Sequence, residues 1–482
     1  MSDYLRLAEE KKIYEFADTL EEQIIRDTAR LVEIPSLPEY ITEDGMPYGP
    51  EISRCLDEAL AMSEKMGFRT HNEEGKYGWA ETGEGDKLLC IFMHLDVVKV
   101  GDGWTREPFK LTREGDMLYG RGVLDDKAPT ICILHALKTC CDLGVKWPCR
   151  VRVWFGTNEE SGKVDIQMYL KKYGVPDYSF IPDSQFPLSY SELSGTGFEL
   201  RKVFHPEKEQ GKYRLVSFEN KIHPNIVAVH ASCSVQTGSE AEAAELVSEA
   251  ERYAAENGFR FTAESSGSEV HIASEGKMAE RWNEPWTGVN GLAQLAMFLA
   301  ELDLGENVNS VMRFVAGKIG TDTDGKKLGV DYVSETASLS MTVKSVRYDD
   351  FGLGFGLYFI FPAELKDENL YLTMLRYARK NGFEIIAQTM AAGFVRDRNM
   401  PLLKVLYKSY CEVTGKNDPI KVCGGTYAKF VPNSIPFGVI FGPEQDICHS
   451  PDEHIRVKSE LMVWVKIYIN ALLRFADSFE EL

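Results

Sequence analysis

Five polar segments of the chain carry side chains that can bind metal ions or transfer protons. In chain order they are His94-Leu95-Asp96, Asp125-Asp126, Glu159-Glu160, Asp183 and His449. Imidazole and carboxylate groups together are ligands for Zn²⁺, with Mn²⁺ or Co²⁺ as alternatives. A further carboxylate beside such a metal can act as a general base. If these segments meet in space, the chain contains a metal site suited to hydrolysis.

The first segment follows a mostly apolar run at residues 88–93, which predicts a buried strand. Side chains alternate between the two faces of a strand, so His94 and Asp96 point the same way. They lie at the carboxyl end of the strand, where ligands bind in open α/β sheets.

Each segment also has an ordinary structural explanation. His94 and Asp96 can form a hydrogen-bonded pair, and Asp125-Asp126 can cap a following helix. Asp183 can belong to a turn, Glu159-Glu160 can be ordinary solvated charge, and His449 can lie in a plain loop. No single motif decides between these readings, and the ordered occurrence of all five favours a metal site.

The elements expected around these segments predict an α/β fold. Strands and helices alternate, which predicts a mainly parallel mixed sheet flanked by helices. Because the carboxyl ends of parallel strands meet at one edge, the five segments can converge there. The expected strands are 88–93, 150–155, 178–181 and 435–441, and the expected helices are 52–66, 127–143, 401–412 and 458–475.

A chain of 482 residues is too long for one compact core, so at least two domains are expected. From about Glu192 the α/β pattern gives way to an α+β pattern, and it returns near Met400. We expect a catalytic domain in two pieces, residues 1–190 and 393–482, with an α+β domain inserted at 191–392.

Charge and composition narrow the function classes. The chain has 54 basic and 74 acidic residues, a formal charge of −20, which argues against nucleic acid or an anionic membrane as a partner. No signal-peptide pattern opens the sequence, and no apolar run approaches the roughly 20 residues of a membrane span. The ten cysteines lack CxxC spacing. These features predict a cytoplasmic protein with reduced thiols.

The ordered motifs carry a family resemblance. His-x-Asp, then Gly-Arg-Gly-x-x-Asp-Asp-Lys at 120–127, then Glu-Glu, Asp and His resembles the dinuclear zinc peptidases related to carboxypeptidase G and succinyl-diaminopimelate desuccinylase. The chain looks most like the monomeric bacterial dipeptidases of the PepV type, including Ile34-Pro35-Ser36 and the run 424–428, Gly-Gly-Thr-Tyr-Ala. The resemblance implies a zinc-peptidase-like catalytic domain, an enlarged lid domain and a monomer.

The resemblance also implies a set of metal ligands. His94 would bind one of two divalent metal ions and His449 the other, with Asp125 bridging both. Glu160 would ligate one metal and Asp183 the other. Zn²⁺ is the first expectation, with Mn²⁺ or Co²⁺ possible.

Two further residues receive catalytic roles from the same resemblance. Glu159 would be the general base that activates a metal-bridging water. Asp96 would orient His94 by accepting the N–H of its other ring nitrogen. The family pattern further implies a cis peptide bond between Asp125 and Asp126.

The resemblance assigns substrate contacts to Asn225, which lines the cleft in the family, and to Gly425, Thr426 and Lys429. Lys429 stands where the family has an arginine, so the charge remains but the bidentate geometry is lost.

Two family side chains are replaced in the inserted domain. Glu280 stands at the position of a lid histidine that stabilises the oxyanion, and Ile360 replaces an arginine that holds the substrate carboxylate. Loss of one oxyanion donor costs about 10²–10³ in rate. We therefore expect weak hydrolysis of ordinary dipeptides unless another group compensates, with Lys429, Arg347 and His230 as candidates.

The leading hypothesis is a hydrolase that cleaves the amide bond of dipeptides or similar small peptides. The alternatives are an N-acyl-amino-acid deacylase or carboxypeptidase, and a non-catalytic metal-binding scaffold with an altered lid. The expected partner is a small peptide or an N-acyl amino acid.

Overall fold

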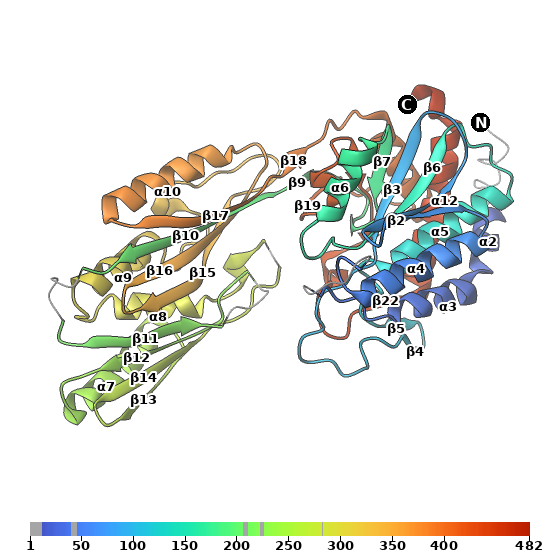
Figure 1. Ribbon diagram of the computed structural model, residues 1–482. Coiled ribbons are helices and arrows are strands. Elements are labelled where there is room, and N and C mark those ends of the chain that lie inside the picture. The colour runs from blue at the N-terminus through green and yellow to red at the C-terminus, as the bar shows by residue number, and fades with distance from the viewer. Residues whose placement is uncertain (1–11, 40–45, 206–210, 222–225, 282) are drawn as a thin grey trace. The chain divides into compact units, whose positions relative to one another are not determined.

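The computed structural model describes residues 12–39, 46–205, 211–221, 226–281 and 283–482. The chain divides into two compact units, each with its own hydrophobic core. Unit 1 comprises Met1–Glu192 and Val395–Leu482, and unit 2 comprises Leu193–Phe394 (Figure 1). The boundaries expected from the sequence, after residues 190 and 392, each lie two residues from these positions.

Unit 1 is built on a six-stranded sheet in the order β1-β2-β6-β3-β7-β20. Three strand pairs, β6/β3, β3/β7 and β7/β20, are parallel, and the pairs β1/β2 and β2/β6 are antiparallel. The expected α/β class with a mainly parallel mixed sheet is therefore confirmed. The strands are β1 (Arg69–Asn72), β2 (Tyr77–Thr82), β6 (Arg150–Gly156), β3 (Leu88–His94), β7 (Tyr178–Ile181) and β20 (Ser434–Pro436).

Alternating side chains along these strands cover both faces of the sheet. Ile91 and Val153 belong to the main core, to which the helices below also contribute. Phe92 and Trp154, one residue further along their strands, contact each other and Tyr169 of another helix, α6 (Val164–Tyr173). The helices of the main core are α2 (Lys12–Asp18), α3 (Glu21–Val32), α4 (Pro50–Lys65), α5 (Lys127–Asp142), α11 (Pro401–Thr414) and α12 (Met462–Asp477).

The strand expected at residues 435–441 is interrupted. It forms β20 and then β21 (Val439–Ile440), which pairs with β8 (Ser184–Gln185) in a separate two-stranded sheet. Gly438 between them has φ of 83°, a conformation that glycine adopts without the strain a side chain would add.

Unit 2 contains two four-stranded antiparallel sheets and the helices α7 (Glu240–Asn257), α8 (Gly291–Leu299), α9 (Glu306–Lys318) and α10 (Asp367–Asn381). One sheet has the order β15-β16-β10-β17 and the other β11-β12-β14-β13 (Figure 1). The strands are β10 (Ser194–Val203), β11 (Arg214–Asn220), β12 (His230–Gln236), β13 (Phe261–Ser266), β14 (Glu269–Glu275), β15 (Ser340–Asp349), β16 (Gly352–Phe361) and β17 (Glu384–Ala391).

Side-chain hydrogen bonds link the two sheets of unit 2, since the Tyr348 hydroxyl of β15 donates to the main-chain oxygen of Leu215 on β11 at 2.7 Å. The Asn220 amide donates to the main-chain oxygen of Lys344 at 3.1 Å and accepts from the N–H of Val346 at 2.9 Å.

With two antiparallel sheets and four α-helices in its described residues, unit 2 has the α+β character expected for the inserted segment. Within the described part of the chain, no helix is both long enough and apolar enough to cross a membrane.

Candidate metal centre

Adjacent parallel strands bring the polar segments of unit 1 to one edge of the sheet. His94 ends β3, Glu159 and Glu160 follow β6, and Asp183 follows β7. Since β6, β3 and β7 are neighbours and parallel, their carboxyl ends lie at the same edge. Asp125 immediately precedes Asp126, which is at the N-cap position of α5 but whose carboxylate accepts the His94 N–H at 3.1 Å and makes no capping hydrogen bond.

The Asp125 carboxylate lies between two histidines. Its Oδ1 is 2.9 Å from His94 Nε2, and its Oδ2 is 3.2 Å from His449 Nε2. His449 Nε2 is also 3.0 Å from Glu160 Oε1, and His94 Nε2 is 3.8 Å from Asp183 Oδ2. The predicted ligands thus form two half-sites that share Asp125, although metal binding by each remains a prediction.

The chemistry of this donor set fits a divalent cation. Two groups of three donors, His94 with Glu159 and Asp183, and His94 with Asp125 and Glu160, have ligand atoms within 4.8 Å of one another. Burial, together with the charge of Asp125, raises the pKa of Glu160 to about 7 and raises the pKa of Asp183. A bound cation would offset the repulsion between these carboxylates.

His94 is oriented by a different atom of Asp96 from the one expected. His94 Nδ1 lies 3.0 Å from the main-chain oxygen of Asp96, whereas the carboxylate oxygen is 3.5 Å away. The Asp96 carboxylate instead accepts the backbone N–H groups of Glu159 and Glu160, each at 3.0 Å. Asp96 therefore positions the glutamate pair as well as the histidine.

A second buried carboxylate continues this anchoring. Asp165, in the first turn of α6, accepts the N–H groups of Thr157 and Asn158 at 2.8 and 2.9 Å. The Tyr427 hydroxyl donates to the same carboxylate at 2.6 Å, and the Ile166 N–H donates to it at 2.8 Å. Burial and the neighbouring Asp96 raise the pKa of Asp165 to about 6. Four consecutive backbone N–H groups, at residues 157–160, are thus held by Asp96 and Asp165.

Another buried pair links the loops of Asp125 and His449. Arg121 donates to Glu453, and the same carboxylate accepts the N–H groups of Gly122 and Leu124 at 3.0 and 2.9 Å. Arg121 is 1% exposed and Glu453 fully buried, so their charges depend on each other. The sequence alone indicates no role for Arg121, Glu453 or Asp165. The charge inside Gly-Arg-Gly was the available signal for Arg121.

Three of the four predicted substrate residues, Gly425, Thr426 and Lys429, lie in the described part of the chain. The Thr426 hydroxyl and N–H both donate to Glu192 of the same unit. The donor of the Thr426 side chain is therefore already used by a carboxylate of the protein. Gly425 lies under Lys429: a Cβ added at Gly425 would come within 3.2 Å of the Lys429 ammonium. Asn225 lies outside the described residues.

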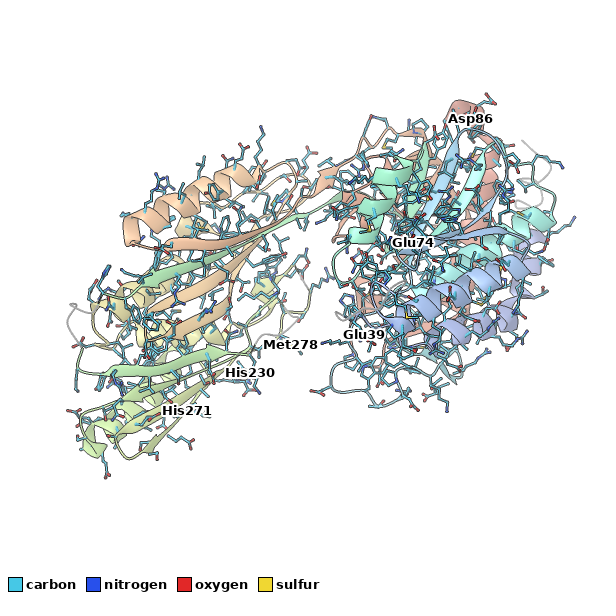
Figure 2. The ribbon with its side chains drawn as sticks, viewed as in Figure 1. Glu39, Glu74, Asp86, His230, His271 and Met278 are labelled. Atoms are coloured by element: carbon cyan, nitrogen blue, oxygen red, sulfur yellow. The ribbon has the colours of Figure 1, made fainter. Side chains whose placement is uncertain are left out.

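The replaced positions are found in unit 2. Ile360 is 3% exposed on β16, and Glu280 is exposed, with an oxygen 3.7 Å from the Lys277 ammonium. His230 and His271 lie on β12 and β14, where both are exposed (Figure 2). Neither histidine belongs to the five-segment site of unit 1.

Comparisons with known proteins agree with this architecture. The family model described as "Peptidase family M20/M25/M40" matches residues 90–474. A protein of Staphylococcus haemolyticus named "Putative dipeptidase" is 29% identical over 458 residues, which are 94% of this chain and 97% of the relative. A Staphylococcus aureus relative with the same description has the same identity and coverage.

Two solved structures share the fold over nearly the whole chain. Human carnosine dipeptidase 1 superposes with a TM-score of 0.57 at 14% identity, covering 98% of this chain and 99% of that one. The Saccharomyces cerevisiae dipeptidase Dug1p has a TM-score of 0.56 at 15% identity, covering 97% and 98%.

Proposed function

Because the chain belongs to peptidase family M20/M25/M40 and is a metallopeptidase, we propose that it hydrolyses the amide bond of a dipeptide or a similar small peptide. We propose two divalent ions, Zn²⁺ first, with Glu159 as the general base. The ligands would be His94, Asp125, Glu160, Asp183 and His449. The observation that best supports this is the Asp125 carboxylate, whose two oxygens face different histidines.

The residues of the site divide the work. When bound, divalent ions polarise a carbonyl group and lower the pKa of a water molecule. Glu159 accepts the proton of that water and returns it to the leaving amine. Asp96 accepts the backbone N–H groups of both Glu159 and Glu160. In this proposal the Glu160 side chain is then a metal ligand, and the Glu159 side chain contacts the water.

Replacement of the base tests this proposal. Glu159→Gln keeps the shape of the side chain but cannot accept the proton, so kcat should fall by at least about 10²-fold. Metal content, measured by mass spectrometry of the purified protein, should stay at the wild-type value. Glu84→Gln, at a side chain 86% exposed in the same unit, is the matched control. Wild-type turnover by Glu159→Gln would contradict the role of Glu159.

The substrate class needs a parallel assay. The relatives named dipeptidases support dipeptides as the first substrates to test. N-acyl amino acids in the same assay separate a dipeptidase from a deacylase or carboxypeptidase. Two bound metals without turnover of either class would favour the non-catalytic scaffold instead.

A further inference from the structure

Lys163 contacts the proposed general base at two points. Its ammonium lies 2.5 Å from the Oε1 of Glu159 and donates to the main-chain oxygen of the same residue at 2.8 Å. The contact with Oε1 is an ion pair, and the hydrogen bond of the ammonium goes to the main-chain oxygen. The contact therefore fixes the carboxylate of Glu159 relative to its own backbone.

The backbone of Lys163 adopts a conformation that suits other residues better. Lys163 has φ of 55° and ψ of 33°, in the left-handed region, immediately before α6. Glycine and asparagine adopt this region with less strain than lysine. A backbone hydrogen bond holds the main chain there: the main-chain oxygen of Asn158 accepts the Lys163 N–H at 2.6 Å. The backbone thus gives no reason for a lysine, and the side chain does.

The ion pair is shielded from water. The Lys163 side chain is 20% exposed and that of Glu159 is 6% exposed. Burial disfavours the charged ammonium, but the carboxylates of Glu159, Glu160 and Asp183 outweigh it and raise the pKa of Lys163. A shielded ion pair is weakened little by salt and holds its geometry better than an exposed one.

Both ends of Glu159 are consequently held. Asp96 accepts its backbone N–H at 3.0 Å, and Lys163 holds Oε1 of its carboxylate. A general base must sit within hydrogen-bond reach of the proton that it removes, and a free glutamate side chain has several rotamers.

We propose that Lys163 is a positioning residue for Glu159: it holds one carboxylate oxygen so that the other is directed at the attacking water. The inference rests on the proposed function of Glu159. Lys163 itself transfers no proton in this account. Its effect should appear in kcat, because the water is activated only in the chemical step.

Three substitutions in the full-length, metal-loaded protein test the proposal. Lys163→Met removes the charge at similar length, Lys163→Arg keeps it, and Lys163→Asn suits the left-handed backbone without the ammonium. We expect kcat to fall by about 10²-fold in Lys163→Met and Lys163→Asn, with KM nearly unchanged. Lys163→Arg should recover to within about tenfold of the wild type. Metal content and thermal stability should remain at wild-type values in all three.

A second readout does not depend on turnover. In crystals of the metal-bound wild type, Glu159 should have one side-chain conformer, and in Lys163→Met it should have several. An unchanged Glu159 conformer in Lys163→Met would overturn the proposal, as would wild-type kcat in both Lys163→Met and Lys163→Asn. If Glu159→Gln retains activity, the proposed base is wrong. If only the Lys163 variants are active, the positioning role alone is wrong.

Discussion

At the scale of single residues, the site is defined by what each carboxylate accepts. Asp96 accepts two backbone N–H groups, Asp165 accepts three more, and Glu453 holds the loop of Asp125. Hydrogen-bonded carboxylates of this kind hold backbone positions more firmly than neutral acceptors. The loops that carry the proposed metal ligands are thus held by three further carboxylates, which accept backbone hydrogen bonds.

Glu192 is a buried acid whose protonation should affect stability. It accepts two hydrogen bonds from Thr426, and burial raises its pKa from 4.5 to about 7. Because the folded chain holds this proton more tightly than the unfolded chain, unfolding between these pH values releases it. The contribution of Glu192 to stability is therefore complete below about pH 4.5 and is lost as the pH rises through 7.

Urea unfolding of the wild type and Glu192→Gln at pH 5, 6 and 7 checks this prediction. The wild type should lose up to about 1.4 kcal/mol of stability per pH unit that the variant does not lose. Parallel pH dependences in the two proteins would show that Glu192 does not titrate in this range.

At the scale of elements, sequence order and strand polarity accounted for much of the site. Residues 88–93 predicted a buried strand, and β3 ends at His94 as expected. The segments after β6 and β7 meet it because neighbouring parallel strands end at one edge. The cis peptide bond between Asp125 and Asp126, implied by the family resemblance, is present.

The remaining contacts depend on residues far apart in the chain. Arg121 meets Glu453 across 332 positions, and Tyr427 meets Asp165 across 262. The sequence does not show which distant residues form a pair, because the residue types are the same whether an Arg–Glu pair is buried or exposed. The atom of Asp96 that accepts from His94 depends likewise on local backbone geometry.

The link between the Asp125 and His449 loops gives a prediction at this scale. Glu453→Gln removes the charge that balances buried Arg121 and loosens both loops. Metal affinity should fall by about 10- to 100-fold, the usual effect of losing a group that supports the ligands. Competition with a chelating dye measures it, with Glu306→Gln, a 52% exposed acid paired with Arg313, as control. Wild-type affinity in a folded Glu453→Gln protein would contradict the supporting role.

At the scale of the whole molecule, the two units have separate cores, and the candidate metal site belongs to unit 1. A metal that binds only the folded site stabilises the unit that contains it. Chelation should therefore speed amide hydrogen exchange at residues 94–96, 125–126 and 157–160. Exchange in the core strands β10 and β12 of unit 2 should stay unchanged. Equal changes in both units would argue against a site confined to unit 1.

The assembly state and the location of the protein remain predictions. We expect a monomer, because the resemblance is to dipeptidases with an enlarged lid domain. Light scattering should give a mass near 54.3 kDa. A mass near twice that value would contradict the expectation. The cytoplasmic location is a prediction from sequence features alone.

Metal reconstitution tests the central claim most directly. Chelator-treated protein is titrated with Zn²⁺ while bound metal and turnover of dipeptides and N-acyl amino acids are measured in the same samples. We predict no turnover without metal and full turnover as a second equivalent binds. Turnover in the metal-free protein would contradict the account. Two bound equivalents with no turnover of either substrate class would do so as well.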